Sequence, residues 1–412
     1  MEVIINLIYF LSMKKLFLSM AFVLVAGGAF AQMDAVKNAT KAGNKGDFAT
    51  AESLIQQALN NPETANLADT WYAAGQIQQK KGAKQLENQI KRQGFDEAAM
   101  YDAALQMTKY FLKADQLPDQ KGKMNAFTSK MASAIMADRG NLVNGGVSAY
   151  RSNEEAGYAK ALDFFGTYVD LANAPMFKNQ AAVVNDTLVP TIAYYATLVA
   201  NEAKNYAAVE KYATIAQGDK ENGATAAQLL VEALKKQEKT DQMLNVLKEA
   251  LNKYPTNQGL FANMIDYYSS QEKYDEALAF ADQQIAKDPS NYFFYYVKGF
   301  VYSLTKDYDN AIEQYKNCIS KKDDYAEAYH DLGNLYEIKA QEFSETASAN
   351  PNDPKFEEDA KTLRGFYEQA RPYYEKARQL APDNVSLWKQ GLGRVYYNLQ
   401  MEKEYEEVMQ AY

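Results

Sequence analysis

Apolar and small residues recur in the carboxyl-terminal half of the chain with a period of 34 residues. Tyr268, Tyr302 and Tyr336 are separated by that interval, and so are Gly299 and Gly333. Within each unit a small residue is followed at the fourth and seventh positions by apolar or small residues, which places all three on one face of a helix. A proline often follows at the twelfth position. The pattern therefore predicts a helix that stops and restarts in every unit.

The second helix of each unit shares one series of small, apolar and terminating positions. The series reads Ala277, Ala281, Gln284, Pro289, then Ala311, Tyr315, Cys318, Asp323, and again Ala370, Tyr374, Ala377, Pro382. It predicts that Cys318 is a core residue. The same frame extends upstream with falling regularity, as far as Ala51. The amino-terminal half is therefore expected to hold degenerate versions of the same unit.

Two leucine-glycine motifs strengthen this interpretation. They are Leu332-Gly333-x-x-Tyr336 and Leu392-Gly393-x-x-Tyr396. Together with the alanine and aromatic series they resemble the tetratricopeptide repeat, whose unit of 34 residues is two antiparallel helices. The resemblance implies an all-α, right-handed α-solenoid of about nine helix pairs. We expect degenerate repeats over residues 32–223 and regular repeats over residues 224–412.

Two of the expected pairs are longer than the regular unit. Between Tyr336 and Ala370 the chain carries 25 residues more than the repeat requires, with two prolines near their middle. This excess predicts a helical-hairpin insertion at about residues 338–365. A smaller excess of 17 residues lies between Trp71 and Ala104. The stretch from Ala137 to Glu155, by contrast, contains three glycines that interrupt the helical period and predict a long loop.

The amino terminus has the layout of a signal peptide. Lys14 and Lys15 precede an apolar run, and Ala29-Phe30-Ala31 supplies the small residues that signal peptidase recognises. We expect translation to start at Met13 and residues 1–31 to be removed. An uncleaved membrane anchor is the alternative, but the apolar run is shorter than the roughly 20 residues of a spanning helix. We therefore expect an exported protein with no membrane span after cleavage, in the periplasm or at the periphery of the outer membrane.

Charge and composition limit the classes of partner that the chain can bind. Without residues 1–31 the chain has 42 basic and 52 acidic residues, a net charge of −10. Its basic residues form no long cluster, so nucleic acid is not an expected partner. The single cysteine cannot form an internal disulfide, and stability must come from packing.

Candidate chemistry is sparse. Nucleophilic and general-base catalysis usually recruit cysteine or histidine, and the repeat already accounts for Cys318 and His330. His330 shares a helical face with Glu327 and Asn334, but one histidine supplies too few ligands for zinc. We expect no catalytic residue, no metal site and no cofactor. A remote alternative is an enzyme whose site lies in the expected loop from Ala137 to Glu155.

Five consecutive aromatic residues, 292–296, offer the clearest candidate for binding. Phe293, Tyr296 and Phe300 lie opposite the packing face of their helix, and in the resembling family that side lines a concave groove. His330 and Asn334 follow along the same groove. Exposed aromatics there would capture an apolar anchor of a protein or peptide, and acidic neighbours favour basic residues beside that anchor. The alternative is that these rings pack against an adjacent repeat.

The last helix suggests a second function. Tyr405, Val408, Met409 and Tyr412 share one face of it, and a repeat array normally needs a polar cap at its end. An exposed apolar face there would allow end-to-end self-association. The chain would then be a structural or assembly component as well as, or in place of, a binding scaffold.

Overall fold

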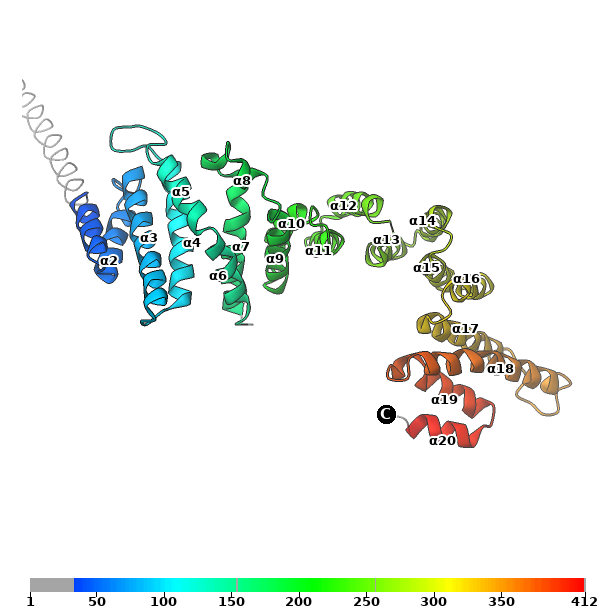
Figure 1. Cartoon of the computed structure of the whole chain (residues 1–412). Coiled ribbons are helices and arrows are strands. Elements are labelled where there is room, and N and C mark those ends of the chain that lie inside the picture. Colours follow the sequence, from blue (N-terminus) through cyan, green and yellow to red (C-terminus); the bar gives the residue numbers. More distant parts are fainter. Residues whose placement is uncertain (1–32, 153–154, 256, 411–412) are drawn as a thin grey trace, which may run out of the picture. The chain divides into compact units, whose positions relative to one another are not determined.

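The computed structural model describes residues 33–152, 155–255 and 257–410, and helices joined by short turns account for most of them (Figure 1). In these ranges β-pairing is limited to one isolated bridge between Pro118 and Met124. The prediction of an all-α array is therefore confirmed. The chain divides into two compact units between Met243 and Leu244. The boundary expected at residue 223 concerns repeat regularity and stays a prediction.

The first unit is built from four helix pairs and five further helical elements. The pairs are residues 33–44 with α2 (Phe48–Asn60), α3 (Ala68–Lys91) with α4 (Glu97–Asp115), α6 (Gly140–Tyr150) with α7 (Glu155–Asp170), and α9 (Val189–Glu202) with α10 (Tyr206–Ala216). The remaining elements are α5 (Thr128–Asp138), the 3-10 turns η1 (Leu171–Asn173) and η2 (Pro175–Phe177), α8 (Ala181–Val184) and α11 (Gly223–Lys236).

The second unit follows α12 (Thr240–Lys253), which spans the division. Its pairs are α13 (Gln258–Ser270) with α14 (Tyr274–Lys287), α15 (Tyr292–Leu304) with α16 (Tyr308–Lys321), α17 (Ala326–Ser344) with α18 (Phe356–Leu380), and α19 (Lys389–Asn398) with α20 (Glu402–Gln410); η3 (Val385–Leu387) precedes the last pair. Over the described residues these are eight pairs within the units. With α11 followed by α12 along the chain, the count agrees with the expected nine.

One turn geometry recurs inside the pairs. In the α15–α16 turn, Lys306 has a φ of 60°, and the next N–H, of Asp307, donates to the carbonyl of Tyr302 at 2.9 Å. This six-to-one bond is a Schellman motif, which ends one helix and redirects the chain into the next. The other left-handed residues with the same bond are Gly46, Arg92, Lys204, Glu238, Glu272 and Gln400.

The core follows the predicted series of small and aromatic residues. Tyr315 and Cys318 on α16 are buried, as are their counterparts Tyr374 and Ala377 on α18. A Cβ on Gly299 would lie 2.8 Å from the Tyr315 ring, so glycine is required for the two helices of that pair to approach. The prediction that Cys318 is a core residue is confirmed.

Both predicted long hairpins are present. Residues 83–100 of the α3–α4 pair and residues 341–369 of the α17–α18 pair contain no buried residue. These segments extend beyond the helices that cover the core. The turn of the second hairpin, residues 345–355, lies within the insertion expected at about 338–365.

The prediction of a long loop from Ala137 to Glu155 is wrong, because α6 occupies Gly140–Tyr150. Its glycines serve packing instead of breaking the helix. A Cβ on Gly145 would lie 2.4 Å from the ring of Phe164, and one on Gly146 would lie 2.4 Å from the ring of Phe165. Glycine at both positions lets α6 lie directly on α7.

The expected signal peptide, residues 1–31, lies outside the described residues. Among the helices that the structure does describe, none combines the length and the apolar character that crossing a bilayer requires.

Candidate protein-binding site

The aromatic run on α15 is mostly used for packing. Phe293 is 9% exposed, and its ring centroid lies 6.0 Å from Phe261 and 6.1 Å from Tyr296. Tyr296 is half-buried, 5.1 Å from the ring of Tyr325. Phe300 is 44% exposed. The expectation of three exposed aromatics is wrong for Phe293 and Tyr296, because adjacent repeats cover them.

The half-buried carboxyl group of Asp331 explains why Tyr296 is not a free anchor. Asp331 accepts hydrogen bonds from the hydroxyls of Tyr296 and Tyr315. Burial raises the pKa of Asp331, although the two tyrosine hydroxyls and the nearby His330 act in the opposite direction. Burial likewise raises the pKa of both tyrosines above the ordinary value. The network ties α15 and α16 to α17.

His330 and Asn334 are both partly buried on α17. His330 Nδ1 lies 2.7 Å from the carbonyl oxygen of Leu387, and because a carbonyl only accepts, Nδ1 carries the proton. The His330 ring is 5.8 Å from the ring of Tyr374. No group of three possible metal ligands occurs among residues 33–152, 155–255 and 257–410. His330 thus contacts Leu387 and Tyr374, and roles for His330 and Asn334 in binding stay predictions.

The last pair presents only part of the apolar face expected of it, since Met409 and Tyr405 are at least partly exposed and Val408 is not. Val408 is fully buried, and Met409, 37% exposed, lies under Gly393, where a Cβ would be 2.9 Å from its sulfur. The Tyr405 ring lies 6.1 Å from that of Tyr397. Tyr412 is outside the described residues. The exposed side of α20 carries Glu402, Lys403, Glu406 and Glu407. The expectation is wrong for Val408 because α19 covers it.

The first unit contains a groove that the sequence did not predict. A pocket of about 280 Å³ lies between α6, α7 and α9, and we call it and the apolar surface around it the α6–α9 groove. Its lining is entirely aliphatic or aromatic: Val147, Tyr150, Phe165, Tyr195, Leu198 and Val199. Tyr150 is 44% exposed and Tyr195 is 41% exposed. Phe165, 2% exposed, forms its floor.

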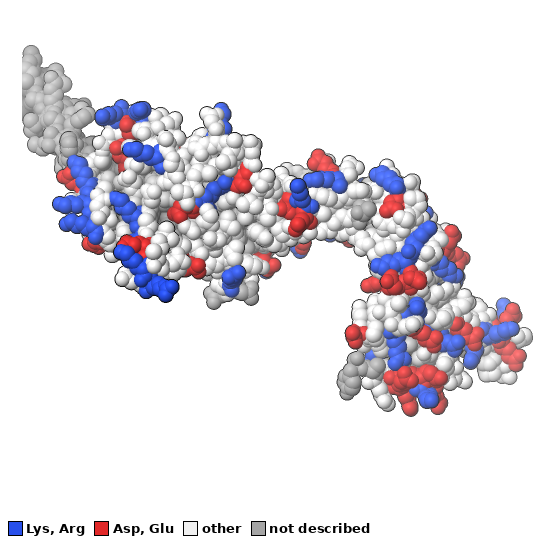
Figure 2. All heavy atoms as spheres, viewed as in Figure 1, with Lys and Arg blue, Asp and Glu red and all other residues white. Residues whose placement is uncertain are grey.

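Two helical stripes form the walls. On α6 the stripe is Val143, Val147 and Tyr150, and on α9 it is Tyr195, Leu198 and Val199. The residues of α6 include no charged side chain, and those of α9 include only the last, Glu202. Figure 2 shows few charged side chains over these helices on the face in view. Solvent-facing helices usually carry more charge.

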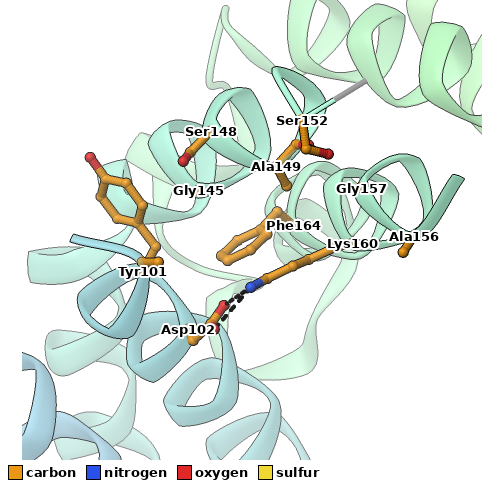
Figure 3. Close-up of a pocket in the computed structure, with 11 residues that line it drawn as sticks. Tyr101, Asp102, Gly145, Ser148, Ala149, Ser152, Ala156, Gly157, Lys160 and Phe164 are labelled. Carbon is orange, nitrogen blue, oxygen red and sulfur yellow. Dashed lines mark hydrogen bonds and ion pairs between the residues drawn. The ribbon is translucent and has the colours of Figure 1, made fainter. Parts of the chain in front are cut away.

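The opposite flank of α6 has different chemistry. A cleft of about 310 Å³ lies between α4, α6 and α7, with Ser148 on the α6 side and Phe164 at its base (Figure 3). Lys160 reaches across it to Asp102, at 2.8 Å. Both side chains of this ion pair are nearly half exposed, so it adds little stability. Helical spacing places Val147 and Ser148 on the two flanks, with the exposed Asn144 and Arg151 between them.

The groove left a signal in the sequence. The range 171–201 contains only Lys178 and Asp186 as charged residues. A long run without charged residues indicates that few of its side chains face water. The three glycines hid the contribution of α6, since their interpretation as a loop removed that helix.

The regular repeat is the part of the chain that matches a known family. The model named Tetratricopeptide repeat matches residues 294–322, which are most of α15 and all of α16. The helix pairs, the recurring turn and the contact of Gly299 with Tyr315 agree with that match. Residues 294–322 therefore form a tetratricopeptide repeat, and the helix pairs on either side of them share its helix-turn-helix architecture.

Several solved structures are similar to it at low identity. The C-terminal part of a TPR repeat-containing protein from Cytophaga hutchinsonii is 14% identical, covering 65% of this chain and 92% of its own, with a TM-score of 0.39. A TPR repeats protein from Bacteroides fragilis is 19% identical (63% and 97% covered, TM-score 0.31), and MamA is 17% identical (44% and 91% covered, TM-score 0.33). No curated protein sequence matches this chain. At these TM-scores the fold assignment rests on the repeat itself.

Proposed function

We propose that this tetratricopeptide-repeat protein is a non-catalytic scaffold that captures an apolar segment of a partner protein in the α6–α9 groove. One observation carries the proposal: a preformed pocket lined only by aliphatic and aromatic side chains lies between α6 and α9, two helices whose residues include a single charged side chain, Glu202. Such pockets hold the anchor residues that dominate the free energy of protein association.

The residues that line the pocket are suited to binding an apolar group and not to catalysis. Val147, Phe165 and Val199 offer neither acid, base nor nucleophile, and the tyrosine hydroxyls are the only polar groups that the six lining residues contribute. A charged ligand group would lose its hydration there without gaining a partner. An apolar side chain would instead exchange water contact for contact with Tyr150 and Tyr195.

We further propose that the scaffold works outside the cytoplasm, in the periplasm or at the periphery of the outer membrane. The charged start, apolar run and small residues of segment 1–31 support this. Mass spectrometry of the protein from its native cells is expected to find Gln32 as the amino terminus. A chain that retains residues 13–31 would contradict the proposed processing.

Photo-crosslinking in the native cell tests the site. The photoreactive residue benzoylphenylalanine replaces Tyr195 in one strain and Phe300, an exposed aromatic of the second unit, in another. We expect a defined adduct from position 195, and its loss when Val147→Glu is added. An adduct that survives Val147→Glu would contradict the proposal. An adduct of the chain with itself would favour the self-associating alternative.

A further inference from the structure

We propose that the outer part of the α3–α4 hairpin, residues 80–97, docks on the surface of a lipid bilayer that contains anionic lipids. We call these residues the hairpin tip. The tip is separate from the α6–α9 groove, so this proposal goes beyond the proposed function and does not depend on it. It follows from the exposed aliphatic side chains of the tip, from its basic charge and from its projection beyond the core.

Two large aliphatic side chains face solvent at the hairpin tip. Leu86 is 50% exposed and Ile90 is 75% exposed, the largest fraction for any large hydrophobic side chain among the described residues. They are at i and i+4 on α3, so they share a face and are about 6 Å apart along the helix axis. The facing part of α4 does not cover them, because residues 83–100 include no buried position. Adjoining exposed aliphatic side chains are typical of an interaction surface.

Basic side chains lie beside these aliphatic ones. Helical spacing places Lys84 and Lys91 together on the face of α3 next to Leu86 and Ile90, and Arg92 follows at the end of the helix. The hairpin tip contains five basic and three acidic residues, whereas the whole chain has a net charge of −9. Figure 2 shows lysine and arginine side chains gathered at the lower edge of the view, where Figure 1 places the turn between α3 and α4.

The acidic residues of the tip neutralise only part of this charge. Glu87 lies between two ammonium groups, since it pairs with Lys84 at 3.0 Å and also with Lys91. Asp96 and Glu97 lie at the start of α4, where the helix dipole stabilises negative charge. The exposed side of α3 therefore presents an excess of positive charge to its surroundings.

An anionic bilayer fits both features of the tip. Its headgroups can pair with basic side chains while the layer beneath them takes up aliphatic ones. The long stems of Lys84 and Lys91 allow their ammonium groups to stay at the level of the headgroups while Leu86 and Ile90 lie deeper. A soluble polyanion would pair with the lysines but would leave the aliphatic side chains in water.

The projecting α17–α18 hairpin of a second copy is the other candidate on grounds of charge. Residues 342–359 contain six acidic residues and one basic residue. That hairpin offers nothing to cover Leu86 and Ile90, because none of the exposed large hydrophobic side chains lies within residues 341–369. Charge alone would match there, whereas a bilayer matches both charge and apolar surface.

Flotation of the mature chain, residues 32–412, with protein-free vesicles tests the proposal. One set of vesicles contains about one-third phosphatidylglycerol in phosphatidylethanolamine, and the other contains phosphatidylcholine alone. Residues 1–31 are left out because their apolar run would bind lipid by itself. We expect the chain to float with the anionic vesicles and several-fold less with the neutral ones. Raising the salt from about 0.1 M to about 1 M should reduce the flotation, because salt screens the headgroup charge.

Matched variants assign the binding to the hairpin tip. Ile90→Glu removes an aliphatic contact and adds a charge that the headgroups repel, so affinity for anionic vesicles should fall about tenfold or more. Leu188→Glu makes a similar change at a 55% exposed position outside the tip and should leave the affinity within about twofold. Lys84→Gln combined with Lys91→Gln should weaken binding to anionic vesicles alone. Circular dichroism should show wild-type melting for each variant, and Ile90→Ser replaces Ile90→Glu if the latter fails to fold.

The outcomes are distinct. No flotation of the wild type with anionic vesicles, or equal flotation of the wild type and Ile90→Glu, would overturn the proposal. Self-association without lipid that Ile90→Glu abolishes, in a chain that does not float, would assign the tip to a second copy and would also overturn it. Val147→Glu, in the α6–α9 groove, should float as the wild type does, so the proposed function and membrane docking are tested separately.

Discussion

The ring of Tyr195 on α9 lies 5.9 Å from the ring of Phe165 on α7, at an interplanar angle of 39°. Phe165 belongs to the core of the first unit, while Tyr195 is 41% exposed. The contact joins a rigid interior to an open surface, so the wall of the α6–α9 groove is held in place before a partner arrives. A preformed site avoids the entropy cost of ordering its side chains on binding.

The glycines of α6 should be essential to that wall. Gly145→Ala or Gly146→Ala places a Cβ about 2.4 Å from the ring of Phe164 or Phe165, so α6 must move away from α7. We expect each change to lower the free energy of unfolding by about 1–3 kcal/mol, the usual cost of overpacking. Thermal unfolding followed by circular dichroism measures it.

Gly140→Ala is the matched control on the same helix. A Cβ there meets nothing within 4 Å, and alanine favours a helix over glycine. We expect no loss of stability, and at most a small gain. Equal losses at Gly140 and Gly145 would show that the ring contacts are not the cause.

Phe293 and Phe300, two aromatic residues of α15, should respond differently to truncation. Phe293→Ala removes a buried ring that contacts Phe261 and should cost about 3–5 kcal/mol. Phe300→Ala removes a 44% exposed ring and should change stability by less than about 1 kcal/mol. Urea unfolding of both variants compares them. A mild effect at Phe293 would restore the sequence-based view of it as a groove residue.

The repeat could be predicted from the sequence because every unit needs the same contact between a small residue on one helix and a large residue on the other. Tyr315 and Tyr374 fill the space left by Gly299 and Gly333, so residue size alone marks the helix contacts. Which aromatic side chains of α15 are exposed could not be predicted from residue size and spacing. Helical spacing correctly separates the faces of one helix, but it does not reveal that Phe261 and Tyr325 come from neighbouring helices to cover Phe293 and Tyr296.

The groove escaped prediction for a related reason. In isolation, Gly145 and Gly146 lower the helical propensity of their segment, and only the rings of Phe164 and Phe165 explain why glycine is needed there. Its apolar walls come from helices that are separated in sequence by all of α7 and α8. Charge depletion was visible along the chain, but which depleted helices lie together depends on the tertiary fold.

The contribution of Asp331 to the stability of the second unit should increase on acidification. Burial raises the pKa of Asp331 in the folded state. Between the unfolded and the folded pKa, the folded protein therefore binds this proton more fully than the unfolded chain does. The contribution of Asp331 to stability is fully present below the unfolded pKa of about 3.9 and is lost as the pH rises through the folded pKa. His330 and Glu327 also act on this carboxyl, and the Tyr296 and Tyr315 hydroxyls face it.

Asp331→Asn isolates this effect because the amide does not titrate. We expect the stability of the wild type relative to Asp331→Asn to increase as the pH is lowered from 7 toward 4, measured by urea unfolding at each pH. A difference that stays constant, or one that grows as the pH rises, would contradict the raised pKa.

The recurring turn offers a stabilising change. Lys306 has a φ of 60°, a conformation that costs a residue with a Cβ about 1–2 kcal/mol. Lys306→Gly removes that cost but increases the entropy of the unfolded chain, so we expect a net gain of about 0.5 kcal/mol. Glu313→Gly, at an exposed position inside α16, should instead lose about 1 kcal/mol. Melting temperatures that fall in both variants would contradict the left-handed assignment of Lys306.

The dissociation constant of the partner that crosslinks at position 195 tests the central claim most directly. It should be measured by titration calorimetry with the purified wild type, Val147→Glu and Ser148→Glu. Capture in the α6–α9 groove predicts affinity weakened about tenfold or more by Val147→Glu and changed by less than about twofold by Ser148→Glu. Equal affinity for all three proteins, or a loss confined to Ser148→Glu, would contradict it.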